Sequence, residues 1–139
     1  MSKLESTLPP DLMARASLRG NEYAWPVEAI PEVIEQAKGH NLISIGGQLQ
    51  FRFADGAICE CYWIEVDTFK TVSPDLRWPE RVRQTAAAAL SGFESLRSEH
   101  DFLAEGRKGF GTVFAEYEAK GQDPRQAMCF VWYAEAEDE

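Results

Sequence analysis

The sequence predicts an α+β fold: a small, largely antiparallel sheet built on a central β-hairpin, with two main helices packed on one face. Residues 42–66 contain two runs with the period-two alternation of strands, joined by a dipeptide that suits a tight turn, Asp55-Gly56. Residues 26–39 and 78–96 repeat apolar side chains at helical spacing. The apolar run 127–134 is expected to add a third strand, because a lone hairpin is marginally stable.

We expect one domain over residues 1–139, because no repeat or linker divides the chain. Residues 1–10 are expected to be loose, and the acidic end 135–139 is expected to fray. Residues 11–19 are typical of a short helix that Gly20 ends, and an aromatic connector follows it.

The first main helix opens at Pro26, since proline suits a first helical turn, and it ends at Lys38-Gly39. Pro31 is tolerated if this helix effectively begins near Ile30. The second main helix starts at Trp78, after a loop, and carries four consecutive alanines that allow close packing on the sheet. These two helices are expected to cover the dry face of the hairpin.

Two patterns compete in residues 112–120, which follow a polar, glycine-rich connector. Phe114 and Tyr117 belong to an apolar set at helical spacing, and Lys120-Gly121 is a typical helix end. Val113 and alternate residues after it also match a strand. We favour the helix.

The hairpin register has two forms. A two-residue turn at Asp55-Gly56, which we favour on turn chemistry, sets Glu60 opposite Phe51 among apolar neighbours. Its other facing pairs are Phe53 with Ile58, Leu49 with Tyr62, and Gly47 with Ile64. A three-residue turn shifts the partner by one and places Cys59, Cys61 and Trp63 on the dry face instead. In the favoured two-residue form, Glu60 is either a functional carboxylate or a rim residue reaching water.

Charge narrows the classes of partner. The chain has 23 acidic and 14 basic residues and a net charge of -9, which argues against nucleic acid and anionic membranes as partners. The same balance favours attraction to a basic protein. Without an apolar run long enough to span a bilayer, or a secretory signal, the sequence predicts a cytosolic protein.

We expect no catalytic residue, metal or cofactor, and therefore no enzyme. Cys59, Cys61 and Cys129 are an odd set without paired zinc spacing, so reduced and buried thiols are the simpler interpretation. Neither His40 nor His100 stands beside a serine or cysteine in a recognisable motif. A hydrolase would require one of them to act as a base.

An ordered set of motifs covers residues 22–96. Its members are Tyr23-Ala24-Trp25 before a helix, Leu42-Ile43-Ser44-Ile45-Gly46-Gly47, a strand from Gln48 to Phe53, a turn at Gly56, Tyr62-Trp63 on the return strand, and a tryptophan-led helix from Trp78 to Leu96. This set resembles the small immunity proteins of bacterial polymorphic toxin systems, in particular the immunity protein 40 family. The strand departs from the Gly-Gly-Asp-Val-Tyr type of that family, and the last third of the chain is unmatched.

The resemblance implies a cytosolic protein that binds and blocks a cognate toxin domain, and it brings no catalytic residues. From the residues themselves, the polar face of the hairpin is the candidate contact surface. Its members are Gln48, Gln50, Arg52 and Trp63, with Glu65 and Asp67 at its end. The alternative is a small ligand-binding or scaffold module, which an apolar pocket between helices and sheet would favour.

Overall fold

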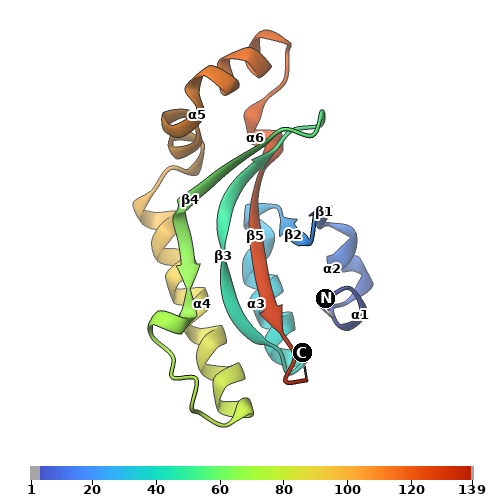
Figure 1. Ribbon diagram of the computed structural model, residues 1–139, viewed down its shortest axis with the longest axis vertical. Helices are drawn as coiled ribbons and strands as arrows, with labels where there is room; N and C mark the ends of the chain where they lie inside the picture. Colours follow the sequence, from blue (N-terminus) through green and yellow to red (C-terminus); the bar gives the residue numbers. More distant parts are fainter. Residues whose placement is uncertain (1–3, 139) are drawn as a thin grey trace.

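A computed structural model describes residues 4–138 and has the predicted α+β architecture (Figure 1). The elements in chain order are α1 (Leu4–Thr7), α2 (Pro10–Ala14), β1 (Ser17–Arg19), β2 (Glu22–Trp25), η1 (Val27–Ala29), α3 (Ile30–Gly39), β3 (Ile43–Arg52), β4 (Ile58–Asp67), η2 (Thr68–Lys70), α4 (Trp78–Glu99), α5 (Phe102–Ala119), α6 (Pro124–Ala127) and β5 (Met128–Glu135). The η elements are single 3-10 turns.

Within residues 4–138 the strands form one antiparallel sheet in the order β1-β2-β5-β3-β4. The hairpin β3–β4 is confirmed, and the run at 127–134 is confirmed as a strand, β5. This last strand inserts between β2 and β3, so β3 is paired along both of its edges. Gly47 permits that pairing, because a Cβ there would lie 1.7 Å from the Val131 carbonyl oxygen.

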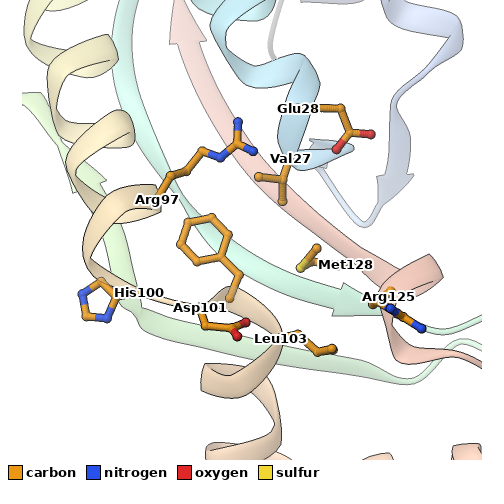
Figure 2. Close-up of a pocket in the computed structure, with 9 residues that line it drawn as sticks. Val27, Glu28, Arg97, His100, Asp101, Leu103, Arg125 and Met128 are labelled. Atoms are coloured by element: carbon orange, nitrogen blue, oxygen red, sulfur yellow. The ribbon is translucent and has the colours of Figure 1, made fainter.

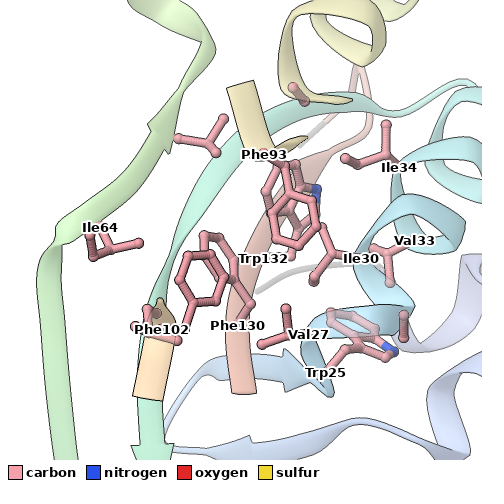
Figure 3. Packing of buried hydrophobic residues seen from close by; sticks show 14 of the residues in the cluster. Trp25, Val27, Ile30, Val33, Ile34, Ile64, Phe93, Phe102, Phe130 and Trp132 are labelled. Atoms are coloured by element: carbon pink, nitrogen blue, oxygen red, sulfur yellow. The ribbon is translucent and has the colours of Figure 1, made fainter. Parts of the chain in front are cut away.

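The helices α3 and α4 cover one face of the sheet, as predicted (Figure 1). α3 begins at Ile30, which leaves Pro31 in the first turn, where its missing N–H costs no hydrogen bond. Figure 3 shows Phe93 of α4 beside Phe130 and Trp132 of β5, and the rings of Phe93 and Phe130 meet edge to face at 5.1 Å. Apolar burial of this kind is the main source of stability on this face.

The helix predicted for residues 112–120 is confirmed, but it is only the second half of α5. The supposed connector before it is helical from Phe102 onward. Non-helical dihedral angles at Phe110 (φ -135°, ψ 41°) kink α5, and Arg107 therefore reaches back to Glu118 with two hydrogen bonds of 2.7 and 3.0 Å. α5 covers the turn end of the hairpin, where Gly106 lies against Phe51.

The N-terminal expectations need correction. Residues 4–7 and 10–14 are helical rather than loose, while residues 1–3 lie outside the described part of the chain. The helix predicted over 11–19 ends at Ala14, its last three residues form the short strand β1, and the supposed connector holds the strand β2. At the other end, Glu135 pairs with Ile43 in the sheet, so the strand extends one residue into the predicted tail.

The favoured two-residue turn is wrong. Gly56 N donates to the Phe53 carbonyl at 3.0 Å, and Phe53 N donates to the Ala57 carbonyl at 2.9 Å, which leaves three residues in the loop. Gly56 takes the left-handed φ of +101° that such a loop needs at its third position. The resulting register pairs Phe51 with Cys59 and Leu49 with Cys61, so both thiols are buried on the helix-covered face.

A second irregularity lies halfway along β4. Leu49 pairs with Cys61, but the next β3 residue, Gln48, pairs with Glu65. Residues 62–64 of β4 therefore have no partner in β3 and form a wide bulge, where β4 bends (Figure 1). For this reason Trp63 does not follow the two cysteines into the core and is 42% exposed.

Candidate protein-binding surface

The structure divides the predicted contact residues into a buried group and an exposed group. Gln50 and Arg52 are only 1% and 7% exposed, so the prediction of a solvent-facing strand is wrong at these two positions. Gln48 is partly buried beside them. These three side chains lie on the sheet face that α3 and α4 do not cover.

Arg52 is buried because the β1–β2 segment reaches across the sheet end to meet it. Its Nη1 donates to the Ser17 carbonyl at 2.8 Å, and its Nη2 donates to the Glu22 carbonyl at 3.2 Å. Its Nε donates to Gln50 Oε1 at 2.9 Å. Burial lowers the pKa of Arg52, although a guanidinium stays charged at neutral pH.

The same network extends to the neighbouring strands. Gln50 Nε2 donates to Glu60 Oε1 at 3.3 Å, and the Tyr133 hydroxyl donates to the Glu22 carboxylate. Burial and that carboxylate raise the pKa of Tyr133. Glu60 itself is exposed, so the rim interpretation of this residue holds. The network ties the sheet together, and Gln50 and Arg52 hold its strands rather than face a partner.

The aromatic pair Tyr62 and Trp63 is the largest apolar feature on the free edge of the sheet. Tyr62 is 66% exposed, and its ring meets the Trp63 ring edge to face at 5.6 Å. The bulge in β4 keeps the Trp63 ring at the surface beside Tyr62. Trp63 was among the predicted contact residues, whereas Tyr62 was not. The three-residue turn predicts that Tyr62 is exposed, because in that register residue 62 lies on the outer face of the strand.

α5 holds Trp63 in place from below. Its indole Nε1 donates to Glu105 Oε1 at 2.8 Å, and its ring stacks with Phe110 at 6.3 Å between centroids. Gly109 leaves room for this contact, because a Cβ there would lie 2.5 Å from the indole ring. The Trp63 hydrogen bond also lowers the pKa of Glu105. The indole is thus fixed along one side and open on the other.

Acidic groups surround this pair. β4 carries three acidic residues and no basic one: Glu60, Glu65 and Asp67. Glu65 pairs with Lys70 at 3.2 Å, with both side chains exposed, and Asp67 caps η2 by accepting from Phe69 N at 3.0 Å. We call the set Glu60, Tyr62, Trp63, Glu65, Asp67 and Glu105 the aromatic edge.

A separate depression of about 360 Å³ lies where α4 ends and α5 begins, beside η1 and α6 (Figure 2). Its base is apolar, and its rim carries both signs of charge, with Arg97 and Arg125 against Glu28 and Asp101. Figure 2 shows the Arg97 guanidinium directed toward Val27. The lining residues include no serine, cysteine or lysine, which leaves His100 and the carboxylates of Glu28 and Asp101 as the groups with nucleophilic atoms there.

The histidines and cysteines stand apart from one another. His40 Nδ1 contacts the carbonyl of Gln36 in its own helix at 2.8 Å, and His100 lies 3.5 Å from Glu105. Burial raises the pKa of Cys61 to about 12 and that of Cys129 to about 11. In the part of the chain that the structure describes, no three His, Cys, Asp or Glu residues are grouped to hold a metal.

Searches of protein-family models, curated proteins and solved structures find no match to this chain. Among the helices of residues 4–138, none combines the length and apolar character needed to cross a membrane.

Proposed function

We propose that this protein is a cytosolic immunity protein, which binds a cognate bacterial toxin domain through the aromatic edge and so neutralises it. The observation that carries the proposal is the exposed, pre-positioned pair Tyr62 and Trp63 on an acidic sheet edge. The motif set in residues 22–96, which resembles the immunity protein 40 family, supports the same conclusion.

The aromatic pair has the properties of an interface anchor. Tyrosine and tryptophan are enriched among residues that dominate binding energy, because they bury much area at a small entropy cost. Trp63 is already oriented by Glu105 and Phe110, so little further order is lost when a partner covers it.

The charge of the surface suggests what kind of partner it meets. The chain carries a net charge of -9, and the acidic residues of β4 lie on both sides of the exposed rings. A basic toxin would be attracted over a distance of about 8–10 Å in physiological salt, which speeds association. Raising the salt concentration should therefore slow association more than it speeds dissociation.

The test uses the C-terminal domain of a large secreted protein, if one is encoded by the neighbouring gene. Co-expression of the immunity protein should rescue cells from that domain, and the purified pair should form a complex. Tyr62→Ala should weaken the complex at least tenfold. Leu18→Ala is the matched control, because Leu18 is 53% exposed on the opposite edge strand and should leave affinity unchanged. No rescue and no complex would reject the proposal.

The alternative of a ligand-binding module draws support from the depression in Figure 2. Its volume is at the low end of the range of about 300–1,000 Å³ for ligand sites. It also has a rim of mixed charge, where Arg97 and Arg125 lie with Glu28 and Asp101. We therefore prefer the protein-binding function.

A further inference from the structure

The two edges of the sheet differ greatly in length. β1, at one edge, has three residues, whereas β4, at the other, has ten. A free strand of this length presents a row of backbone N–H and C=O groups that can pair with another chain.

The register identifies which groups of β4 point outward. Phe53 N bonds to the Ala57 carbonyl, so Cys59 and Cys61 also turn their backbone groups toward β3. The residues that alternate with these, Ile58 and Glu60, therefore direct their N–H and C=O groups away from the sheet. Residues 58–61 form a straight edge segment that ends at the bulge.

The side chains beside this segment favour one class of occupant. Ile58, Glu60 and Tyr62 alternate along the strand and share the uncovered face, and Ile58 and Tyr62 are 41% and 66% exposed. A second copy of β4 would set acidic residues against acidic residues, which is unfavourable. A basic strand is complementary to Ile58, Glu60 and Tyr62 if it carries a lysine or arginine with apolar residues two positions before and two positions after it.

We propose that a basic, extended segment of the partner adds to the sheet as a further strand beside residues 58–61. Its backbone pairs with Ile58 and Glu60, its cation lies beside the Glu60 carboxylate, and its apolar side chains pack on Ile58 and Tyr62. This inference rests on the proposed function, since the segment belongs to the toxin domain. It adds how recognition occurs: main-chain pairing supplies affinity, and the acidic and apolar side chains supply selectivity.

The deciding measurement is amide hydrogen exchange, resolved by residue by NMR, for the free protein and its complex with the C-terminal domain encoded beside this gene. The amides of Ile58 and Glu60 should exchange quickly in the free protein and at least tenfold more slowly in the complex. The amide of Cys61, which already bonds within the sheet, is the internal control and should change little.

Two variants at residue 60 separate the contribution of the backbone N–H to binding from the contribution of the carboxylate charge. Glu60→Pro removes the outward N–H without removing a bond to β3, as proline is tolerated on edge strands in this orientation. It should weaken the complex more than Glu60→Gln, which removes only the charge. If Glu60→Pro fails to fold, the exchange measurement on the unmodified chain still decides.

The outcomes distinguish the two proposals. A complex in which Ile58 and Glu60 exchange as they do in the free protein would overturn strand addition and leave the immunity function standing. The absence of any complex would reject the immunity function and strand addition with it. Slowed exchange at these two amides, with Glu60→Pro weaker than Glu60→Gln, is the result we expect.

Discussion

The two faces of the sheet both exclude water, but they do so in different ways. On the helix-covered face, large side chains such as Phe51 and Phe130 are fully buried under α3, α4 and α5. On the uncovered face, a small cluster of Ala24, Cys129 and Val131 is buried without any helix above it. There the covering groups are long polar side chains, Arg52 among them, held by hydrogen bonds. Close packing of large apolar side chains therefore stabilises the covered face, and a hydrogen-bonded polar network stabilises the uncovered face.

The largest expected effect is a cavity on the covered face. Phe51→Ala should lower the free energy of unfolding by about 3–5 kcal/mol, because Phe51 is fully buried and packs edge to face on Phe114 at 4.9 Å. Urea unfolding measures this change. Phe69→Ala is the control, as Phe69 is 54% exposed and should cost less than about 0.5 kcal/mol. Equal losses in the two variants would contradict the assignment of the core.

The next effect addresses the uncovered face. Arg52→Ala should cost about 2–4 kcal/mol, since it leaves the buried acceptor on Gln50 and the partly buried acceptors on Ser17 and Glu22 without their donor. Arg52→Lys should recover only part of this loss, because an ammonium lacks the planar fork of the guanidinium.

The matched control for Arg52 is a surface arginine. Arg15→Ala removes an exposed ion pair with Glu32, 3.0 Å long, and should change the free energy of unfolding by less than about 1 kcal/mol. If Arg52→Ala were as mild as this control, the polar network would not be what stabilises the uncovered face.

A third test concerns a polar contact at the end of the covered face. The Tyr117 hydroxyl donates to Asp55 Oδ2 at 2.5 Å, and this bond lowers the pKa of Asp55. A carboxyl whose pKa is lower in the folded state stabilises the protein above its unfolded pKa of about 3.9, and that contribution is lost as the pH falls through the folded pKa. Thermal unfolding between pH 2 and 5 should therefore depend less steeply on pH in Asp55→Asn.

The same bond also makes stability depend on pH in the alkaline range, through the tyrosine hydroxyl. It raises the pKa of Tyr117 to about 12, so the stabilisation is complete below pH 10 and is lost as the pH rises toward 12. Tyr117→Phe should remove this alkaline dependence. An unchanged pH profile in both variants would show that the bond does not contribute to stability in solution.

The smallest expected effect is at the aromatic edge. Tyr62→Ala should alter the free energy of unfolding by no more than about 0.5 kcal/mol, because its ring is mostly solvated. Trp63→Ala should cost more, since it also removes the hydrogen bond to Glu105 and the stacking on Phe110. A large loss in Tyr62→Ala would mean that this ring serves the fold rather than a partner.

The long elements could be predicted from sequence because their periodicity extends over many residues. β3, α3, α4 and β5 all follow from that signal. β1 was predicted as the end of a helix and β2 as a connector, since three or four residues show no clear period and β2 pairs with β5, about a hundred residues away. The start of α5 was missed because its glycines resemble a loop, although Gly106 is there to admit the Phe51 ring.

The candidate site was predicted in part for similar reasons. Asp55-Gly56 suits both turn lengths, so local chemistry could not decide the register. Arg52 was expected in solvent because nothing in its own strand reveals that Ser17 and Glu22 fold across it. The bulge that exposes Trp63 arises from the mismatch between β3 and β4, which only the paired strands display.

Because its thiols are buried, the rate at which this protein reacts with a thiol reagent reports how often its structure opens. Cys59, Cys61 and Cys129 are hidden, and their raised pKa values leave very little thiolate for an alkylating reagent. Labelling by iodoacetamide should therefore proceed only through molecules that have opened, and mass spectrometry of each tryptic peptide would time the opening of β4 separately from that of β5. A single cysteine placed at residue 62 would then accept a fluorophore while the natural thiols remain unmodified.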